Sequence, residues 1–211
     1  RAWLLSTYQP ATCNRILSAV RGALRTAWEL ELLSHEDMAR ACAVKSVKGG
    51  STEPAGRALT DGEIAALLRV CRADPTPAGP RDAAIIGLGT YGTLRREEIA
   101  RLPLDAYDAG AATMRVMGKG RKVRRVYLTA GLCVAIDEWL SLRGAHPGPL
   151  FLAIRKGGAI LRSGISGAAV YGVLGKRAAE AGVKNVRPHD MRRTCITNMI
   201  DAGVDSITIA D

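Results

Sequence analysis

Three short patterns contain side chains that can stabilise a transferring phosphoryl group. Arg95 and Glu98 lie in LRREE, Lys119 lies in GKGRK, and His189 and Arg192 lie in PHDMRR. Phosphodiester transfer gathers negative charge on the non-bridging oxygens, and permanently charged, forked guanidinium groups suit that charge. A lysine can protonate a leaving alkoxide, and a histidine can donate a hydrogen bond or carry a proton near neutral pH. Together these residue types indicate phosphodiester chemistry.

Each pattern is weak by itself, because an H-x-x-R sequence is ordinarily a polar helix start and a GKG sequence an ordinary turn. Local spacing adds some information. His189 and Arg192 are three residues apart at a helix start, so they share a face that also attracts phosphate. Glu98 follows Arg95 at the same spacing, where it can hold a guanidinium or accept a bond from a neighbouring histidine or lysine.

The elements that must position these residues are mostly helices. Hydrophobic periodicity and capping residues predict them. Short β-rich runs on either side of GKGRK predict a hairpin. In the first part of the chain, helices are expected at 11–33, at 34–43 with Ser34 as N-cap, and from the Thr60–Glu63 capping box onward, where Ile64, Leu67, Leu68 and Cys71 form the inner face. A buried apolar helix and a second helix are expected within 81–102. Further helices are expected at 129–143, from Ser163 or Ser166 to Gly182, and at 189–202 before Gly203.

The first predicted helix has an apolar stripe with basic residues beside it. The stripe is expected to be buried and consists of Ile16, Val20, Leu24 and Ala27 or Trp28. The basic residues are candidates for phosphate contacts, although a solvated helix face would have the same pattern. They are Arg15, Arg21 and Arg25.

The charge balance favours a polyanionic partner. Thirty Lys and Arg residues against 20 Asp and Glu residues give a net charge of +10, which favours nucleic acid over a membrane surface. Aromatic residues make up only 4% of the chain, so duplex phosphates fit better than single-stranded bases stacked on aromatic rings. The mean hydropathy of +0.04 argues against a disordered chain, and no apolar run reaches the roughly 18 residues of a membrane span.

A Gly-, Ser-, Pro- and Lys-rich stretch divides the sequence. We expect a domain at 1–45, a linker at 46–58 and a second domain at 59–211. The five cysteines contain no C-x-x-C pair, so we expect reduced thiols in a cytoplasmic protein and neither a zinc site nor a disulfide framework. The first residues lack the features of a signal peptide.

Taken in order, the three patterns resemble the tyrosine recombinase (phage-integrase-like) family. RDAAIIGLGTYGTLRREEIARL resembles its first arginine box, with Thr93 where Gly is common; VMGKGRKVRRVYL resembles its lysine-bearing hairpin, and RPHDMRRTCITNMIDAGVD its H-x-x-R helix. The resemblance implies a mainly α fold with a small antiparallel sheet (α+β). It assigns 59–211 to the catalytic domain and 1–45 to part of a helical, SAM-like core-binding domain that clamps DNA.

The resemblance also implies residue roles. Arg95 and Arg192 would bind the scissile phosphate, Lys119 would protonate the leaving 5′-oxygen, His189 would support both, and Glu98 would fix the pocket. Lys122 is an alternative to Lys119, because both lie in one turn. Further DNA contacts are expected from Arg15, Arg21, Arg25, Arg96, Arg121, Lys122, Arg124 and Arg193.

The implied partner is double-stranded DNA, with self-association of the intact protein into a tetramer on paired sites. No metal, cofactor, small-molecule substrate or membrane is implied. The expected location is the cytoplasm, on the nucleoid.

One departure from the family concerns the nucleophile. The family carries a further His or Trp and then a nucleophilic Tyr after H-x-x-R, but no tyrosine follows Arg192 here. Tyr171 precedes that helix, and we expect it to have a packing role. We therefore expect a trimmed chain, a stable proteolytic fragment or the product of a decayed gene.

These expectations leave three functions open. The intact protein would recombine DNA through a 3′-phosphotyrosine, whereas the 211 residues would bind DNA as a monomer without cleaving it. The first alternative is a non-catalytic DNA-binding remnant or a regulator of recombination. The second, weaker alternative is an enzyme like the type IB topoisomerases, which share the chemistry.

Overall fold

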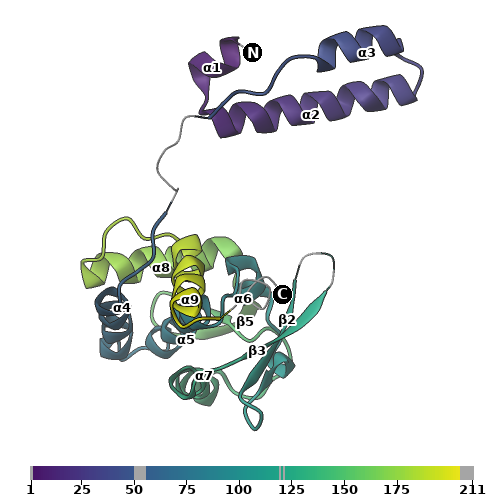
Figure 1. The fold of residues 1–211 in the computed structure, drawn as a ribbon. Helices are drawn as coiled ribbons and strands as arrows, with labels where there is room; N and C mark the ends of the chain where they lie inside the picture. Colours follow the sequence, from purple (N-terminus) through teal and green to yellow (C-terminus); the bar gives the residue numbers. More distant parts are fainter. Residues whose placement is uncertain (1, 50–55, 119, 121, 205–211) are drawn as a thin grey trace. The chain divides into compact units, whose positions relative to one another are not determined.

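The computed structural model describes residues 2–49, 56–118, 120 and 122–204. Its internal contacts divide the chain into an N-terminal unit, Arg1–Pro54, and a C-terminal unit, Ala55–Asp211. Figure 1 shows the two units, which are described separately below. The point of division lies inside the range 46–58 whose composition is typical of a linker.

The N-terminal unit consists of three helices. They are α1 (Ala2–Thr7), α2 (Pro10–Glu29) and α3 (His35–Cys42), and α3 packs along α2. The Ser34 hydroxyl caps α3 by accepting a hydrogen bond from the backbone N–H of Asp37 at 3.1 Å, which confirms the predicted cap. The buried apolar residues of this unit are Leu4, Cys13, Leu17 and Val47.

The apolar stripe predicted for the first helix is wrong in part. Val20 and Trp28 are 50% and 41% exposed, and the buried positions of α2 are Cys13 and Leu17. The reason is that α1 and the segment around Val47 cover the first half of α2. Val47, only 6% exposed, exchanges two backbone hydrogen bonds with the Asn14 side chain at 2.7 and 2.9 Å. The first residues of the predicted linker therefore belong to the core of the N-terminal unit.

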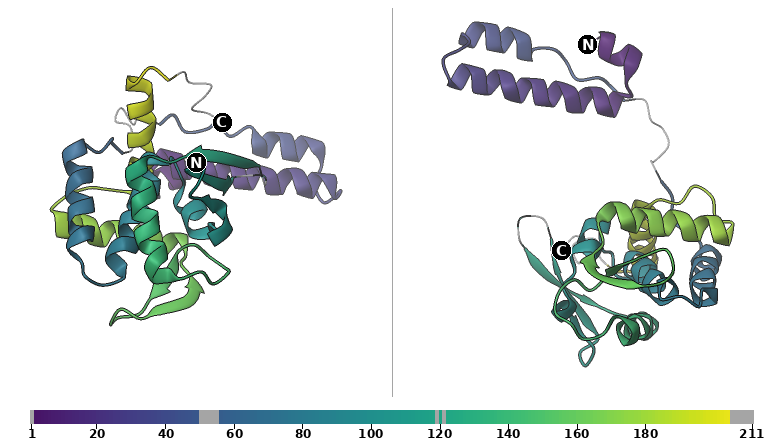
Figure 2. Two further views of the ribbon diagram at one scale, coloured as in Figure 1. Left: turned by 90° about the horizontal axis from the view of Figure 1, so that it is seen from below. Right: turned by 180° about the vertical axis from the view of Figure 1, so that it is seen from behind.

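The C-terminal unit is mainly helical and contains two small antiparallel sheets, which confirms the expected fold class. The first sheet has the order β1-β2-β3 and the second pairs β4 with β5 (Figure 2). Its elements are α4 (Asp61–Ala73), α5 (Ala78–Tyr91), α6 (Arg96–Arg101), a 3-10 turn at Leu104–Ala106, β1 (Tyr107–Asp108), β2 (Thr113–Met117), β3 (Val123–Tyr127), α7 (Ala130–Arg143), β4 (Leu152–Ile154), β5 (Ile160–Gly164), α8 (Gly167–Ala181) and α9 (Pro188–Asp201).

Local signals predicted most of these boundaries. Thr60 and Glu63 form the expected capping box: the Glu63 N–H donates to the Thr60 hydroxyl at 3.2 Å, and the Thr60 N–H donates to the Glu63 carboxylate at 2.9 Å. Helix α8 begins after Ser166, the second of the two predicted starts, and ends at Gly182 with a φ of +70°. The hairpin also formed as predicted, with Met117 paired to Val123 next to the turn.

Helix α5 lies at the centre of the unit, because its apolar sequence is buried on nearly every side. It packs against α4, α7 and α9. Two glycines let its neighbours approach closely: a Cβ at Gly87 would lie 2.7 Å from Leu132 of α7, and one at Gly89 would lie 2.8 Å from Met191 of α9. Gly89 thus allows the close approach of α9, which carries His189 and Arg192. None of the described helices is long and apolar enough to cross a membrane.

Candidate active site

The loop between α5 and α6 leads into Arg95 and also contacts Arg192, so it links the two elements that carry the arginines of the site, α6 and α9. Arg95 is the N-cap of α6, and Arg192 lies on α9, about a hundred residues further along the chain. The Nη1 of Arg192 donates a hydrogen bond of 2.9 Å to the carbonyl oxygen of Thr93. Thr93 has a φ of +56°, a left-handed conformation that is unfavourable for a β-branched residue. The backbone turn at Thr93 therefore holds the Arg192 side chain close to the start of α6.

Glu98 holds two guanidinium groups. Its Oε2 accepts from the Arg95 backbone N–H at 2.8 Å, and its Oε1 accepts from the Arg95 Nη1 at 3.0 Å. Arg124 of β3 adds a bidentate pair of bonds, with distances of 3.1 and 2.9 Å. Burial opposes ionisation of Glu98, but the hydrogen bonds from Arg124 and Arg95 more than offset it and lower the pKa to about 2. Glu98 is therefore an anion throughout the neutral range.

The environment of Arg192 favours an added negative charge. Burial lowers the pKa of Arg192, and the positive charges of Arg95 and Arg124 lower it further, while Glu98 opposes them. Because the cations outnumber the one carboxylate, an oxyanion placed among them would be stabilised.

A pocket of about 350 Å³ opens at this point, between α6, α8 and the start of α9. It brings together three of the predicted catalytic residues, Arg95, His189 and Arg192. His189 and Pro188 reach it because α9 begins at its wall. The pocket is lined by Arg95, Arg96, Glu97, Tyr171, Arg187, Pro188, His189 and Arg192.

Sequence reasoning assigned no site role to four residues of this pocket, which are Glu97, Tyr171, Arg187 and Pro188. Tyr171, expected to have a packing role, is 51% exposed on α8 and lines the pocket. Arg187 is the N-cap of α9 and lines it as well. The position of Arg187, directly before the helix that bears His189, was a signal that could have identified it. Nothing local marks Tyr171, because only the packing of α8 against α6 brings it there.

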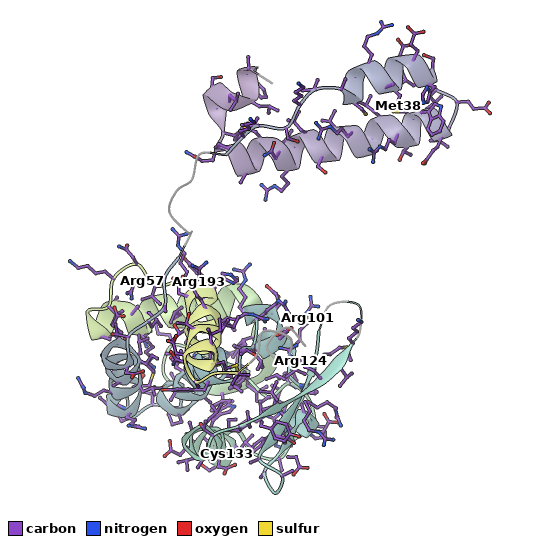
Figure 3. The ribbon with its side chains drawn as sticks, in the orientation of Figure 1. Met38, Arg57, Arg101, Arg124, Cys133 and Arg193 are labelled. Atoms are coloured by element: carbon purple, nitrogen blue, oxygen red, sulfur yellow. The ribbon has the colours of Figure 1, made fainter. Side chains whose placement is uncertain are left out.

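The hairpin candidates fall into two groups. Lys119 and Arg121 lie outside the described residues. Lys122 is exposed, and its carbonyl oxygen accepts a hydrogen bond of 2.8 Å from the Gly118 N–H. Arg124, expected to contact DNA, instead points toward Glu98, and its side chain is 22% exposed. Figure 3 labels it beside the hairpin.

The remaining candidates for DNA contacts differ in their environment. Arg15 and Arg25 are exposed on α2, whereas Arg21 donates a hydrogen bond to the carbonyl oxygen of Val44. Arg96 forms a half-exposed ion pair of 3.5 Å with Glu97. Arg193 donates a hydrogen bond of 3.2 Å to the carbonyl oxygen of Gly56. Arg21 and Arg193 are thus engaged in contacts within their own units.

The sequence of the chain is similar to those of known proteins. A sequence model of the phage integrase family matches residues 57–211. The chain is 26% identical over 212 residues to tyrosine recombinase XerC of Corynebacterium efficiens, covering 97% of this chain and 65% of that protein. It is 31% identical over 167 residues to tyrosine recombinase XerD of Xanthomonas axonopodis pv. citri, covering 71% and 51%. The chain thus spans about two thirds or less of the length of these relatives.

Solved structures show the same fold. A lambda integrase (75-356) dimer bound to a COC′ core site has a TM-score of 0.72 at 12% identity, covering 99% of this chain and 73% of that one. The crystal structure of XerA recombinase has a TM-score of 0.62 at 19% identity, covering 97% and 73%.

Proposed function

Because the chain belongs to the phage integrase family, we propose that it acts in site-specific DNA recombination or integration. Strands would be cleaved and rejoined through a 3′-phosphotyrosine intermediate. The observation that carries the proposal is the pocket that gathers Arg95, His189 and Arg192 around space for an oxyanion. No tyrosine follows Arg192 in the 211 residues. The chain as printed is therefore proposed to bind DNA without cutting it, and cleavage is assigned to a polypeptide that carries the tyrosine.

The proposed roles follow from chemistry and position. Arg95 and Arg192 bind the non-bridging oxygens of the scissile phosphate, where negative charge grows in the transition state. Glu98 holds the guanidinium of Arg95 in place. His189, at the N-terminus of α9, donates a hydrogen bond to the phosphate and supports proton transfer. Lys119, with Lys122 as the alternative, protonates the leaving 5′-oxygen.

The proposed partner is double-stranded DNA, on which the intact protein assembles as a tetramer in the cytoplasm, on the nucleoid. Supporting observations are the net charge of +10 and the exposed cations Arg15, Arg25, Arg96 and Lys122. A similar solved structure is described as a lambda integrase dimer on a core site. The two units are proposed as a partial core-binding domain and a catalytic domain, each of which contacts the duplex.

Duplex binding is tested by measuring the dissociation constant over a range of salt concentrations. We expect steep weakening with salt, because each neutralised phosphate releases counterions. The R192A variant should weaken binding by roughly tenfold, the cost of losing one charge-assisted contact. The matched control is R72A, which removes one exposed positive charge of α4 outside the pocket and should have little effect. A flat salt response, or equal losses in both variants, would contradict the proposed binding site.

Cleavage is tested with a nicked suicide substrate that traps a covalent protein–DNA adduct. We expect no adduct from the 211-residue chain, so an adduct would disprove the assignment of the chemistry to a tyrosine after Arg192. In a polypeptide extended through its natural reading frame, we expect an adduct that R192A abolishes. Undiminished activity of R192A in that polypeptide would refute the site.

A second candidate function is a non-catalytic DNA-binding remnant or a regulator of recombination. The observation in its favour is the same basic surface, with a net charge of +10 and exposed cations such as Arg15 and Arg25. The genomic reading frame beyond the codon for Asp211 separates the two candidates. A continuation with a His or Trp and then a Tyr supports the recombinase, and a stop codon supports the remnant.

A further inference from the structure

The β2–β3 hairpin contacts the arginine box through one carboxylate, at the end of the hairpin next to its turn. Glu98 belongs to α6 and lies under the hairpin, where its two oxygens accept bonds from Arg95 of the same helix and Arg124 of β3. Its side chain is 7% exposed, which excludes most water from the contact. A bidentate arginine–carboxylate pair fixes both distance and orientation, so this contact determines how β3 sits on α6.

Neighbouring arginines of β3 show that the contact is specific. Successive strand residues point to opposite faces, and the structure follows this rule. Arg124 is directed inward to Glu98, whereas Arg125 is exposed and has no side-chain partner in the part of the chain that the structure describes. One arginine of the hairpin therefore belongs to the interior of the site, and the next does not.

The lysine-bearing turn begins directly above this ion pair. The Gly118 N–H donates to the Lys122 carbonyl oxygen at 2.8 Å and so joins the two strand ends that flank the lysine in sequence. A Cβ added to Gly118 would lie 3.4 Å from the Arg124 Nη1 and 3.8 Å from the Glu98 Oε1. The Gly118 backbone thus lies close to the Glu98–Arg124 ion pair, and Glu98 also holds Arg95.

We propose that Arg124 is a positioning residue, which couples the lysine-bearing turn to Arg95 through Glu98, and that it does not contact DNA. The proposal rests on the proposed function, because the coupling matters only if the turn delivers a proton to a phosphate that Arg95 binds. It replaces the DNA-contact role predicted for Arg124 from sequence. The pKa values agree with the geometry: Arg124 contributes to the low pKa of Glu98 and also lowers the pKa of Arg192.

The coupling is tested on the 211-residue chain by NMR, without DNA. Hydrogen exchange of the Gly118 N–H and the pKa of the Glu98 carboxyl are compared in wild type, R124A, R124K and R125A. R125A is the matched control, since it removes the same charge from the next residue of the strand. In R124A we expect exchange at Gly118 to accelerate by about tenfold and the Glu98 pKa to rise. R124K, which keeps the charge but loses the fork, should show a smaller acceleration, and R125A should match wild type.

Wild-type exchange at Gly118 in R124A, or equal acceleration in R124A and R125A, would overturn the coupling. Should R124A fail to fold, R124K against R125K makes the same comparison, with acceleration expected only in R124K. A second measurement follows duplex affinity over a range of salt concentrations. The slope of log affinity against log salt concentration should be the same in R124A as in wild type. A slope reduced by about one would mark a lost phosphate contact and would refute the positioning role. If wild type does not bind duplex at all, the proposed function fails, and the exchange comparison still decides the coupling.

Discussion

At the scale of single residues, the site depends on a backbone conformation that its residue disfavours. Thr93 has a φ of +56°, and its carbonyl oxygen holds the Nη1 of Arg192. A β-branched side chain is strained in the left-handed region, where glycine is not. The resemblance to the family pointed to the same position, where Gly is common. The neighbouring packing of Arg192 and Cys195, whose Sγ contacts the Tyr91 carbonyl oxygen, keeps the loop in this conformation.

Replacing Thr93 by glycine should therefore stabilise the C-terminal unit. We expect T93G to raise the free energy of unfolding by about 1 kcal/mol, because it relieves left-handed strain. The carbonyl that binds Arg192 remains, so duplex affinity should not change. Urea denaturation and a binding titration check the two parts. A lower free energy of unfolding in T93G would show that the threonine side chain stabilises the fold by more than its left-handed backbone strain destabilises it.

At the scale of elements, one face of α9 lines the pocket and another binds the segment before α4. His189 and Arg192 face the pocket, while Asp190 and Thr194 hold the segment that leads into α4. The Asp190 carboxylate accepts from the Arg57 N–H at 3.1 Å, and the Thr194 hydroxyl accepts from the Leu59 N–H at 2.8 Å. The last residues of the predicted linker range are thus bonded to the helix that carries the site.

Gly56 is the position where this attachment is most sensitive. Its φ is +101°, and a Cβ there would clash with the Asp190 Oδ1. We expect G56A to lower the free energy of unfolding by about 3 kcal/mol, from backbone strain together with a disturbed buried hydrogen bond. The control is G182A, which has a φ of +70° and open space around the new Cβ, and which should cost only about 1 kcal/mol. Equal losses in denaturant titrations would contradict a role for the Asp190 contact.

Helices α4, α5 and α8 are joined by a buried ion cluster. Arg177 of α8, fully buried, donates to Asp82 of α5 at 2.8 Å and to Asp74 after α4 at 2.6 Å. Replacing Arg177 by Met should lower the free energy of unfolding by about 3 kcal/mol, because the buried Asp82 and the largely buried Asp74 each lose a hydrogen-bonded cation. K176M removes the adjacent, half-exposed cation and should cost less than about 1 kcal/mol. Thermal or urea unfolding distinguishes the two, and a similar small loss in both variants would count against the cluster.

At the scale of the whole molecule, acid should destabilise the C-terminal unit. Hydrogen bonds from Arg57 lower the pKa of Glu63 to about 2. Burial raises the pKa of Asp74 and Glu98, but hydrogen bonds from Thr76 and Arg177 to Asp74, and from Arg124 and Arg95 to Glu98, lower each to about 2. A carboxyl whose pKa is lower in the folded state contributes stability above its unfolded pKa and loses it as pH falls.

The free energy of unfolding should therefore be constant between about pH 5 and pH 8 and fall steadily from about pH 5 toward pH 2. Urea denaturation of the chain across this range measures it. E98Q, which has no charge to titrate at this position, should be less stable at neutral pH and show a shallower fall. Stability that rises on acidification would contradict the ionised state of these carboxyls in the folded protein.

The sequence by itself determined most of the helices, several of their caps and the local pairs of the site. Ser34, Thr60 and Ser166 mark helix starts because a hydroxyl at an N-cap satisfies a free N–H wherever the helix lies. The pairs Arg95–Glu98 and His189–Arg192 share a face because helical spacing is local. The family resemblance rested on such short-range patterns, and the family match bears it out.

Tertiary structure alone decided which neighbour each face meets. Val20 is exposed although it continues an apolar stripe, because nothing in the described N-terminal unit covers that part of α2. Tyr171 lines the pocket because α8 packs on α6, and Arg124 turns inward because Glu98 lies under the hairpin. Periodicity sets which residues share a face, but the partner of that face comes from elements distant in sequence. The contact of Arg124 with Glu98 and the place of Tyr171 in the pocket lining could therefore be found only from the folded structure.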